Sequence, residues 1–142
     1  MARSSDSEGV AIIGIGESDV GKRLGRSAHS LYSQAIHGAI ADAKLDKSQI
    51  DGLITINSNA EPRTRHAMSV AQYVGLRSTS VKWIMTGKHG SVDASGGALR
   101  DAAMAIRSGV CKYVGVAAGD AEGTAGRDRS GEHTSELQSH LN

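Results

Sequence analysis

The feature that most constrains the fold is an alternation of short β-branched runs with segments of helical periodicity. Four apolar runs, each too short for a typical helix, begin at Val10, Leu53, Ser80 and Val110. Between them, apolar residues recur every three or four positions, which is the spacing of one helix face. Strands that alternate with helices are typical of a parallel sheet with right-handed crossovers. The sequence therefore predicts an α/β fold ordered β-α-β-α-β-α-β, with a mostly parallel sheet and packed helices.

Local end signals place the individual elements. Strands are expected at residues 10–15, 53–56, 80–85 and 110–118, and helices at 28–44, 67–74 and 98–106. Ser27 is the predicted N-cap of the first helix, because its hydroxyl can accept a free backbone N–H of the first turn. Gly75 is expected to end the second helix in the left-handed conformation that glycine tolerates. A glycine-rich stretch, 87–97, precedes the third helix.

Composition narrows the class of protein. Aromatic residues make up 3% of the chain and glycines number 18, so small side chains favour close packing of helices on a sheet. The net charge of +1 provides no general attraction to nucleic acid or to an anionic membrane. The chain has one cysteine and therefore no internal disulfide, as in a reducing compartment. We expect a cytoplasmic protein with no membrane span and no nucleic-acid partner.

One motif suggests a nucleotide-binding alternative. Residues 16–23, Gly-Glu-Ser-Asp-Val-Gly-Lys-Arg, match the first seven positions of the phosphate-binding loop G-x-x-x-x-G-K-[ST]. Arg23 stands where that loop needs a hydroxyl for magnesium, and Gly25 interrupts the helix that should begin at the lysine. The other interpretation, which we favour, is a glycine-rich surface loop.

A second candidate site opens the third helix. A helix N-terminus stabilises an anion, so a nucleophile placed near Asp93 would be favoured there, although aspartate at such a position is most often an N-cap. His89, Ser95 and Gly96 are the candidate substrate-binding residues around it. Cys111 is predicted to be a small buried hydrophobe.

The histidines do not suggest a metal site. His29, His37, His66 and His89 lack the spacing of metal ligands, so we predict no metal and no cofactor. His29 and His37 lie eight residues apart on one predicted helix, about two turns, and both are expected on its polar face.

The order of these segments resembles the thiolase superfamily. The run Val-Ala-Ile-Ile-Gly-Ile-Gly at 10–16 is similar to the first strand of that family, and 39–45 followed by Ile-Asp-Gly-Leu at 50–53 is similar to its first helix and second strand. Val-Gly-Leu at 74–76 resembles the end of its second helix. The most specific match is 94–109, Ala-Ser-Gly-Gly-Ala-Leu-Arg-Asp-Ala-Ala-Met-Ala-Ile-Arg-Ser-Gly, which resembles the helix that follows the catalytic nucleophile. Residues 113–122 resemble the next strand and its turn.

The resemblance implies a protein that handles acyl-CoA, as either an acyltransferase of lipid metabolism or a sterol-carrier or lipid-transfer relative. In active thiolases, a cysteine directly before Ala-Ser-Gly takes the acyl group as a thioester. Asp93 occupies the matching position here. We therefore expect a CoA thioester as possible substrate and no covalent acyl transfer by this chain. A non-catalytic lipid or acyl carrier, or a structural domain, stays open as an alternative beside the nucleotide-binding one.

The predicted organisation has three parts. Residues 1–8 are expected to be disordered and 9–123 to form an incomplete N-terminal thiolase-like domain, without the second repeated half of that family. Residues 124–142 are polar and contain two leucines; part of this tail resembles a translated sequencing adapter, which we interpret as non-native read-through. The resemblance also implies a homo-oligomer in the intact parent, and an incomplete sheet favours self-association through its edge.

Overall fold

The computed structural model describes residues 9–76, 81, 83–87 and 93–122, and the fold below refers to these residues. Its elements are α1 (Ala28–Asp42), a 3-10 turn (Lys47–Gln49), β1 (Gly52–Ile56), α2 (His66–Val74), β2 (Trp83–Gly87), α3 (Asp93–Arg107) and β3 (Val114–Ala117). None of these helices has the length and apolarity needed to cross a membrane.

The three described strands form one parallel sheet in the order β2-β1-β3. Leu53 of β1 is in register with Ile84 of β2 and with Gly115 of β3. The chain thus runs from the central strand β1 to β2 at one edge of the sheet, and then crosses β1 to reach β3 at the other edge. This confirms the predicted α/β fold with a parallel sheet and packed helices.

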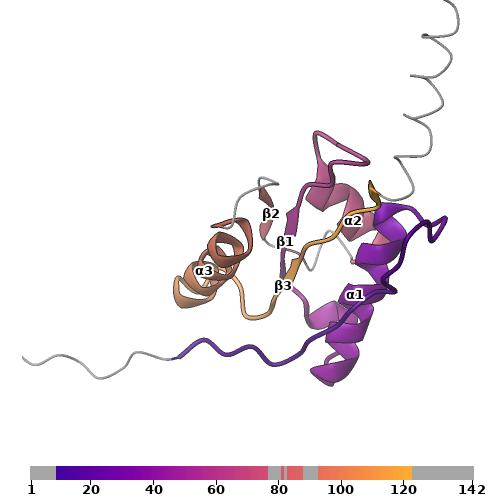
Figure 1. Cartoon of the computed structure of the whole chain (residues 1–142). Coiled ribbons are helices and arrows are strands. Elements are labelled where there is room, and N and C mark those ends of the chain that lie inside the picture. The colour runs from indigo at the N-terminus through magenta and orange to yellow at the C-terminus, as the bar shows by residue number, and fades with distance from the viewer. Residues whose placement is uncertain (1–8, 77–80, 82, 88–92, 123–142) are drawn as a thin grey trace, which may run out of the picture.

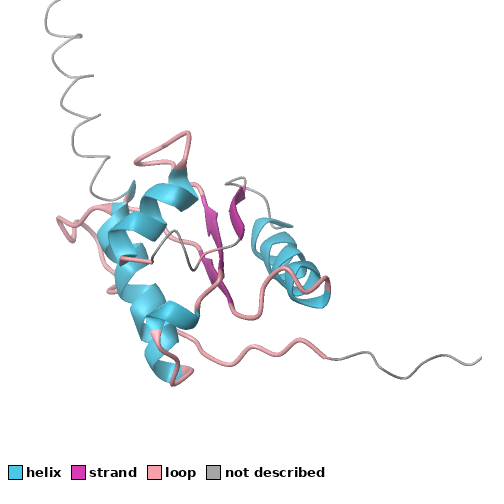
Figure 2. Ribbon diagram, turned by 180° about the vertical axis from the view of Figure 1, so that it is seen from behind, coloured by secondary structure: helices cyan, strands magenta, loops and turns pink. Residues whose placement is uncertain are grey.

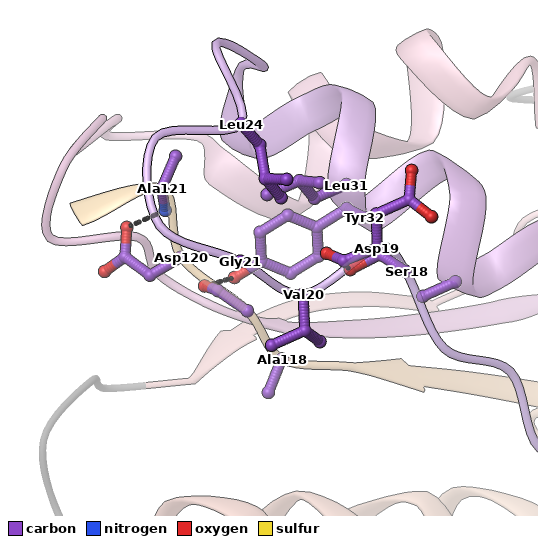
Figure 3. A pocket seen from close by; sticks show the side chains of 12 residues that line it. Ser18, Asp19, Val20, Gly21, Leu24, Leu31, Tyr32, Ala118, Asp120 and Ala121 are labelled. Carbon is purple, nitrogen blue, oxygen red and sulfur yellow. Dashed lines mark hydrogen bonds between the residues drawn. The ribbon is translucent and has the colours of Figure 1, made fainter. Parts of the chain in front are cut away.

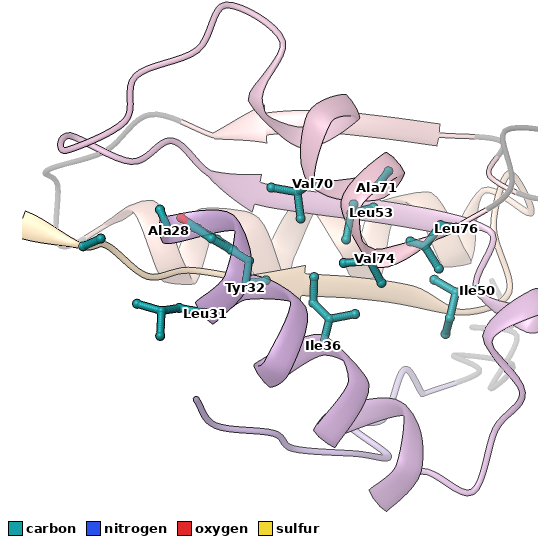
Figure 4. Close-up of a cluster of buried hydrophobic side chains, with 12 residues drawn as sticks. Ala28, Leu31, Tyr32, Ile36, Ile50, Leu53, Val70, Ala71, Val74 and Leu76 are labelled. Atoms are coloured by element: carbon teal, nitrogen blue, oxygen red, sulfur yellow. The ribbon is translucent and has the colours of Figure 1, made fainter. Parts of the chain in front are cut away.

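Helices cover both faces of the sheet, with α1 and α2 on one face and α3 on the other (Figures 1 and 2). Successive residues of β1 point to opposite faces, so Leu53 joins the core under α1 and α2 while Ile54 and Ile56 pack under α3. All five residues of β1 are buried. The larger core, shown in Figure 4, gathers Tyr32 and Ile36 with side chains of α2 around Leu53.

The predicted end signals operate as expected. The Ser27 hydroxyl accepts the N–H of Ser30 at 3.2 Å and caps α1. Gly75 follows α2 with φ of 77°, the left-handed conformation that lets the chain leave the helix. Asp51, which precedes β1, accepts the backbone N–H groups of Lys112 and Tyr113 and so connects the entry of β1 to that of β3.

The prediction of a buried first strand at 10–15 is wrong. The segment is extended but belongs to no described strand, and Ile12 and Ile15 are 71% and 69% exposed. It lies against α1 instead. A Cβ at Gly14 would approach the carbonyl oxygen of Ala39 to 2.3 Å, and one at Gly16 that of Ala35 to 2.1 Å. The glycines therefore allow a close contact with the helix backbone. β-branched residues favour an extended backbone, but they do not determine that the segment pairs with another strand.

Several element boundaries also differ from the prediction. Helix α3 begins at Asp93, five residues before the predicted start, and includes Gly96 and Gly97. Strand β3 is confined to Val114–Ala117, and Val110 is 45% exposed. Strand β2 extends to Gly87 rather than ending at 85. Residues 1–8 and 124–142, the predicted disordered start and the tail, lie outside the described residues.

Replacing Gly16 with alanine tests the contact between the N-terminal segment and α1. The added methyl group has no room beside the Ala35 carbonyl, so we expect a loss of about 1–3 kcal/mol in the free energy of unfolding and faster tryptic cleavage at Lys22 and Arg23. Gly9→Ala is the matched control, because a Cβ there meets nothing within 4 Å. Equal stability and equal cleavage of the two variants would contradict this packing.

Candidate functional site at the carboxyl ends of β1 and β3

The carboxyl ends of β1 and β3 meet where the strand order reverses. In open parallel sheets, ligands bind in the crevice outside the carboxyl ends of strands at such a point. Asn57, Ser58 and Asn59 follow β1, and Gly119 and Asp120 follow β3 shortly after its end. Polar side chains from distant parts of the chain are thereby brought to one edge of the sheet.

The carboxylate of Asp120 organises this edge. It accepts the Ser58 hydroxyl at 2.6 Å and the backbone N–H groups of Asn59, Ala60 and Ala121 at 2.8, 3.1 and 2.8 Å. Partial burial opposes ionisation, but these hydrogen bonds outweigh it and hold the pKa of Asp120 below its usual value. Asp120 is therefore a fixed anion that ties the two loops together.

Tyr32 of α1 connects the same two loops from the apolar side. Tyr32 is 2% exposed, and its one hydroxyl proton is shared between the carbonyl oxygens of Ile56 and Gly119, the latter at 2.7 Å. Burial raises the pKa of Tyr32 to about 12, and the nearby Asp120 carboxylate acts in the same direction. The hydroxyl is thus a neutral donor across the physiological pH range. In the loop that follows β1, the Asn57 Oδ1 atom is buried and has no hydrogen-bond partner among the described residues.

A cavity of about 290 Å³ lies beside Tyr32 (Figure 3). One wall comes from the N-terminal loop with Val20 and Leu24, another from α1 with Leu31 and Tyr32, and a third from Ala118 and Asp120. Most of its side chains are alkyl or aromatic, so the cavity suits an apolar group with a polar end near the loop carboxylates.

A buried histidine lies beneath this edge. His66, the first residue of α2, is fully buried, and its Nδ1 pairs with the Thr55 hydroxyl at 2.9 Å. Its Nε2 has no partner among the described residues. Desolvation lowers the pKa of His66, with smaller contributions in the same direction from His29 and Arg63. The imidazole is therefore held neutral.

His29 departs from the sequence prediction. It was expected on a polar helix face, but it is 5% exposed and its ring centroid lies 5.6 Å from that of His66. The reason is that α2 packs across the start of α1 and covers it. His37 is exposed as predicted. No group of three or more metal-binding side chains occurs among the described residues.

The residues predicted around the third helix are only partly described. Asp93 is the first residue of α3, Ser95 lies in its first turn, and Gly96 is exposed with open space around it. His89 lies outside the described residues. Cys111 is buried as predicted, packs on Gly52 and donates its Sγ proton to the Asp51 carbonyl at 3.4 Å. The structure thus places the cysteine beyond the opposite end of α3 from Asp93.

The loop at 16–23 lacks the geometry of a phosphate-binding loop. No described strand precedes it, Lys22 and Arg23 form a turn, and α1 begins at Ala28. In the phosphate-binding loop the helix begins at the lysine, so that its free N–H groups face the phosphates. Here Asp19 accepts from Arg26 at 2.8 Å and Gln34, which makes the segment a structural loop on α1.

Sequence reasoning missed Tyr32, Ser58 and Asp120. Tyr32 occupies an apolar position of the helical pattern, so nothing in the sequence indicates that its hydroxyl forms hydrogen bonds to two loops. Ser58 and Asp120 are 62 residues apart and meet only because β1 and β3 are neighbours. The one available signal was the polar residues that follow each strand run, since parallel strands bring their carboxyl ends to one edge.

The fold defined by this sheet and its two helical layers is thiolase-like. No family model matches the chain. A 3-oxoacyl-[acyl-carrier-protein] synthase III from Aquifex aeolicus has the same fold, with a TM-score of 0.65 at 19% identity; the match covers 79% of this chain and 45% of that chain.

Two curated relatives are more similar in sequence. The chain is 35% identical to a steroid side-chain-cleaving aldolase of Thermomonospora curvata and 33% identical to a 17-hydroxy-3-oxo-4-pregnene-20-carboxyl-CoA lyase of Mycobacterium tuberculosis, over 73% of this chain in each case. A solved Ltp2-ChsH2(DUF35) aldolase matches at 33% identity with a TM-score of 0.60, covering 71% of this chain and 25% of that chain. The chain spans about a quarter of the length of the curated relatives it matches.

Removing the Tyr32 hydroxyl should loosen the edge between β1 and β3. Tyr32→Phe leaves two carbonyl groups without their donor, so we expect a loss of about 1–3 kcal/mol in the free energy of unfolding, measured by urea denaturation. Tyr73→Phe is the control, because Tyr73 is 57% exposed, and we expect it to change stability by less than about 0.5 kcal/mol. Similar losses for both variants would argue against the bridging role.

His66 should make stability fall on mild acidification. Its folded pKa lies below the unfolded value, so between about pH 7 and pH 5 the unfolded chain binds more protons and folding weakens as pH drops. Asp120, whose pKa is also lowered, contributes stability that is lost only below about pH 4.

Urea unfolding at several pH values separates the two groups. His66→Asn should flatten the dependence between pH 7 and pH 5, whereas the exposed control His37→Asn should retain it. An unchanged slope in the His66→Asn protein would show that another group is responsible.

Proposed function

We propose that the chain forms part of a thiolase-like protein of lipid metabolism that acts on CoA thioesters as a carbon–carbon lyase, and that this part forms no acyl-thioester intermediate on a cysteine. The proposal narrows the acyl-CoA function expected from the sequence. An acyltransferase of the thiolase type is the broader alternative within the same fold.

The observation that carries the proposal is the position of the only cysteine. Cys111 is buried against Gly52 and lies four residues beyond the end of α3. Helix α3 has 15 residues, so its two ends are about 22 Å apart. A thiolate at the start of α3, stabilised by the helix dipole, is what covalent acyl transfer needs, and Asp93 stands at that start. An acyl group on a carboxylate would be a mixed anhydride, more energetic than the thioester from which it came.

Carbon–carbon cleavage removes this requirement. In a retro-aldol reaction a base takes the proton of a hydroxyl group, the bond to the carbon next to the thioester breaks, and its electron pair forms an enolate that is then protonated. No bond to an enzyme sulfur forms at any step. The names of the curated relatives, an aldolase and a lyase of a carboxyl-CoA compound, agree with this class of reaction.

The non-catalytic carrier function is the second candidate, favoured by the cavity beside Tyr32. Its alkyl walls suit an acyl or sterol group. A nucleotide-binding function is not proposed, because the loop at 16–23 has neither strand nor helix where phosphate binding requires them.

Location and partners follow from the same proposal. We place the protein in the cytoplasm, where CoA thioesters are used and where the thiol of the buried Cys111 would stay reduced. We further propose that the intact parent is a homo-oligomer, with acyl-CoA as its ligand.

A chimaera tests the function. Residues 9–122 would replace the matching segment of the Thermomonospora curvata aldolase, and the purified protein would be incubated with a β-hydroxyacyl-CoA thioester. We expect a carbonyl product and a shortened acyl-CoA, detected by chromatography, and no thioester adduct on Cys111 by intact mass.

Two other outcomes would overturn the proposal. A folded chimaera that binds the thioester without cleaving it would favour the carrier function. Release of free CoA with a hydroxylamine-sensitive adduct that maps to Cys111 or to the start of α3 would instead favour acyl transfer of the thiolase type. A Cys111→Ala chimaera is the matched control, and we expect its cleavage rate to be unchanged.

A further inference from the structure

The Ser69 hydroxyl, the His29 imidazole and the Glu61 carboxylate lie side by side where α2 packs on the start of α1. The Ser69 hydroxyl lies 2.9 Å from His29 Nε2, and His29 Nδ1 lies 3.5 Å from Glu61 Oε2. A nucleophilic serine is identified by this arrangement, in which a base contacts its hydroxyl and a carboxylate orients the base. We propose that Ser69 is a nucleophile towards activated esters and thioesters, with His29 as its general base.

The protein fixes each of these three side chains. Glu61 Oε1 accepts the N–H of Ala28 at 2.9 Å at the start of α1, which holds the carboxylate beside His29. The imidazole of His29 is 5% exposed and packs between the rings of His66 and Tyr73, at 5.6 and 5.9 Å. Ser69 is half-buried in the middle of α2. Because the Glu61 carboxylate lies beside Nδ1, it favours the His29 tautomer that carries its proton on Nδ1. Nε2 can then accept the proton of the Ser69 hydroxyl.

The surroundings suit an ester with a hydrophobic group. Arg65 and Tyr73 lie one helical turn before and after Ser69, and both are exposed. The Arg65 guanidinium can balance the charge of a tetrahedral intermediate, while Tyr73 provides apolar contact for the acyl or leaving group.

The reaction balances with water as the only co-reactant. The Ser69 oxygen bonds to the carbonyl carbon as its proton moves to His29 Nε2. The bond to the alcohol or thiol then breaks, and His29 returns the proton to the leaving group. Water, deprotonated by His29, attacks the acyl-serine and releases the carboxylic acid. This hydrolysis is separate from the proposed lyase reaction, and either can fail without the other.

A fluorophosphonate probe tests the nucleophile in the full chain. We expect one phosphonylated residue, Ser69, by peptide mass mapping, with no label in Ser69→Ala. The matched control is Ser33→Ala, because Ser33 also contacts a histidine, His37 at 3.3 Å, but on an exposed helix face. His29→Gln should slow labelling about 10²-fold. Labelling of another serine, or no labelling of Ser69, would overturn the proposal.

A cysteine at the same position measures the base directly. In Ser69→Cys, His29 should favour the thiolate, so iodoacetamide should alkylate it at pH 7 about tenfold faster than the cysteine of Ser33→Cys. The pH profile of this rate should shift to lower pH, and His29→Gln in the same chain should cancel both effects. Equal rates for the two cysteines, with circular dichroism showing both variants folded, would show that His29 does not act as a base towards this position.

Discussion

The burial of β1 on both faces is the constraint on which the rest of the structure depends. Its five residues are all buried, and alternate side chains serve two separate cores, Leu53 under α1 and α2 and Ile54 under α3. A strand buried in this way requires helices on both sides and neighbours on both edges. Asp51 strengthens the arrangement, since its carboxylate binds the backbone just before β3. The order β2-β1-β3 and the crevice at the carboxyl ends follow from this central position.

The polar side chains of the candidate site lie where the packed core ends. Tyr32 reaches the loops from within the core, and Asp120 binds them from the other side. Burial, with a further contribution from the Asp120 carboxylate, raises the pKa of Tyr32 and keeps the phenol neutral. Hydrogen bonds lower the pKa of Asp120 and keep it ionised despite partial burial. The same packing of α1 against α2 that buries His66 also brings His29 to Ser69 and Glu61. One helix pair therefore positions both the proposed hydrolytic site and one wall of the cavity.

The N-terminal run shows how a local pattern can suggest the wrong partner. Residues 10–15 have the composition of a buried strand, yet Ile12 and Ile15 are exposed in the described structure. Gly14 and Gly16 bring this backbone onto α1. The start of α3 shows the opposite case. Its glycines suggested a loop, but the helix begins at Asp93, because an amphipathic face that continues through Ala98 and Ala102 to Ala105 offsets the cost of glycine.

The sequence by itself determined the α/β class, three of the four strand positions, the caps at Ser27 and Gly75, and the absence of a thiol at the start of α3. These depend on local periodicity, backbone preference and residue identity, all of which can be read along the chain. Only the tertiary structure decided that Ser58 meets Asp120, that Tyr32 joins Ile56 to Gly119, and that His29 lies between Ser69 and Glu61. These contacts join residues far apart in sequence, and they exist because β1 and β3 pair and α2 packs across α1.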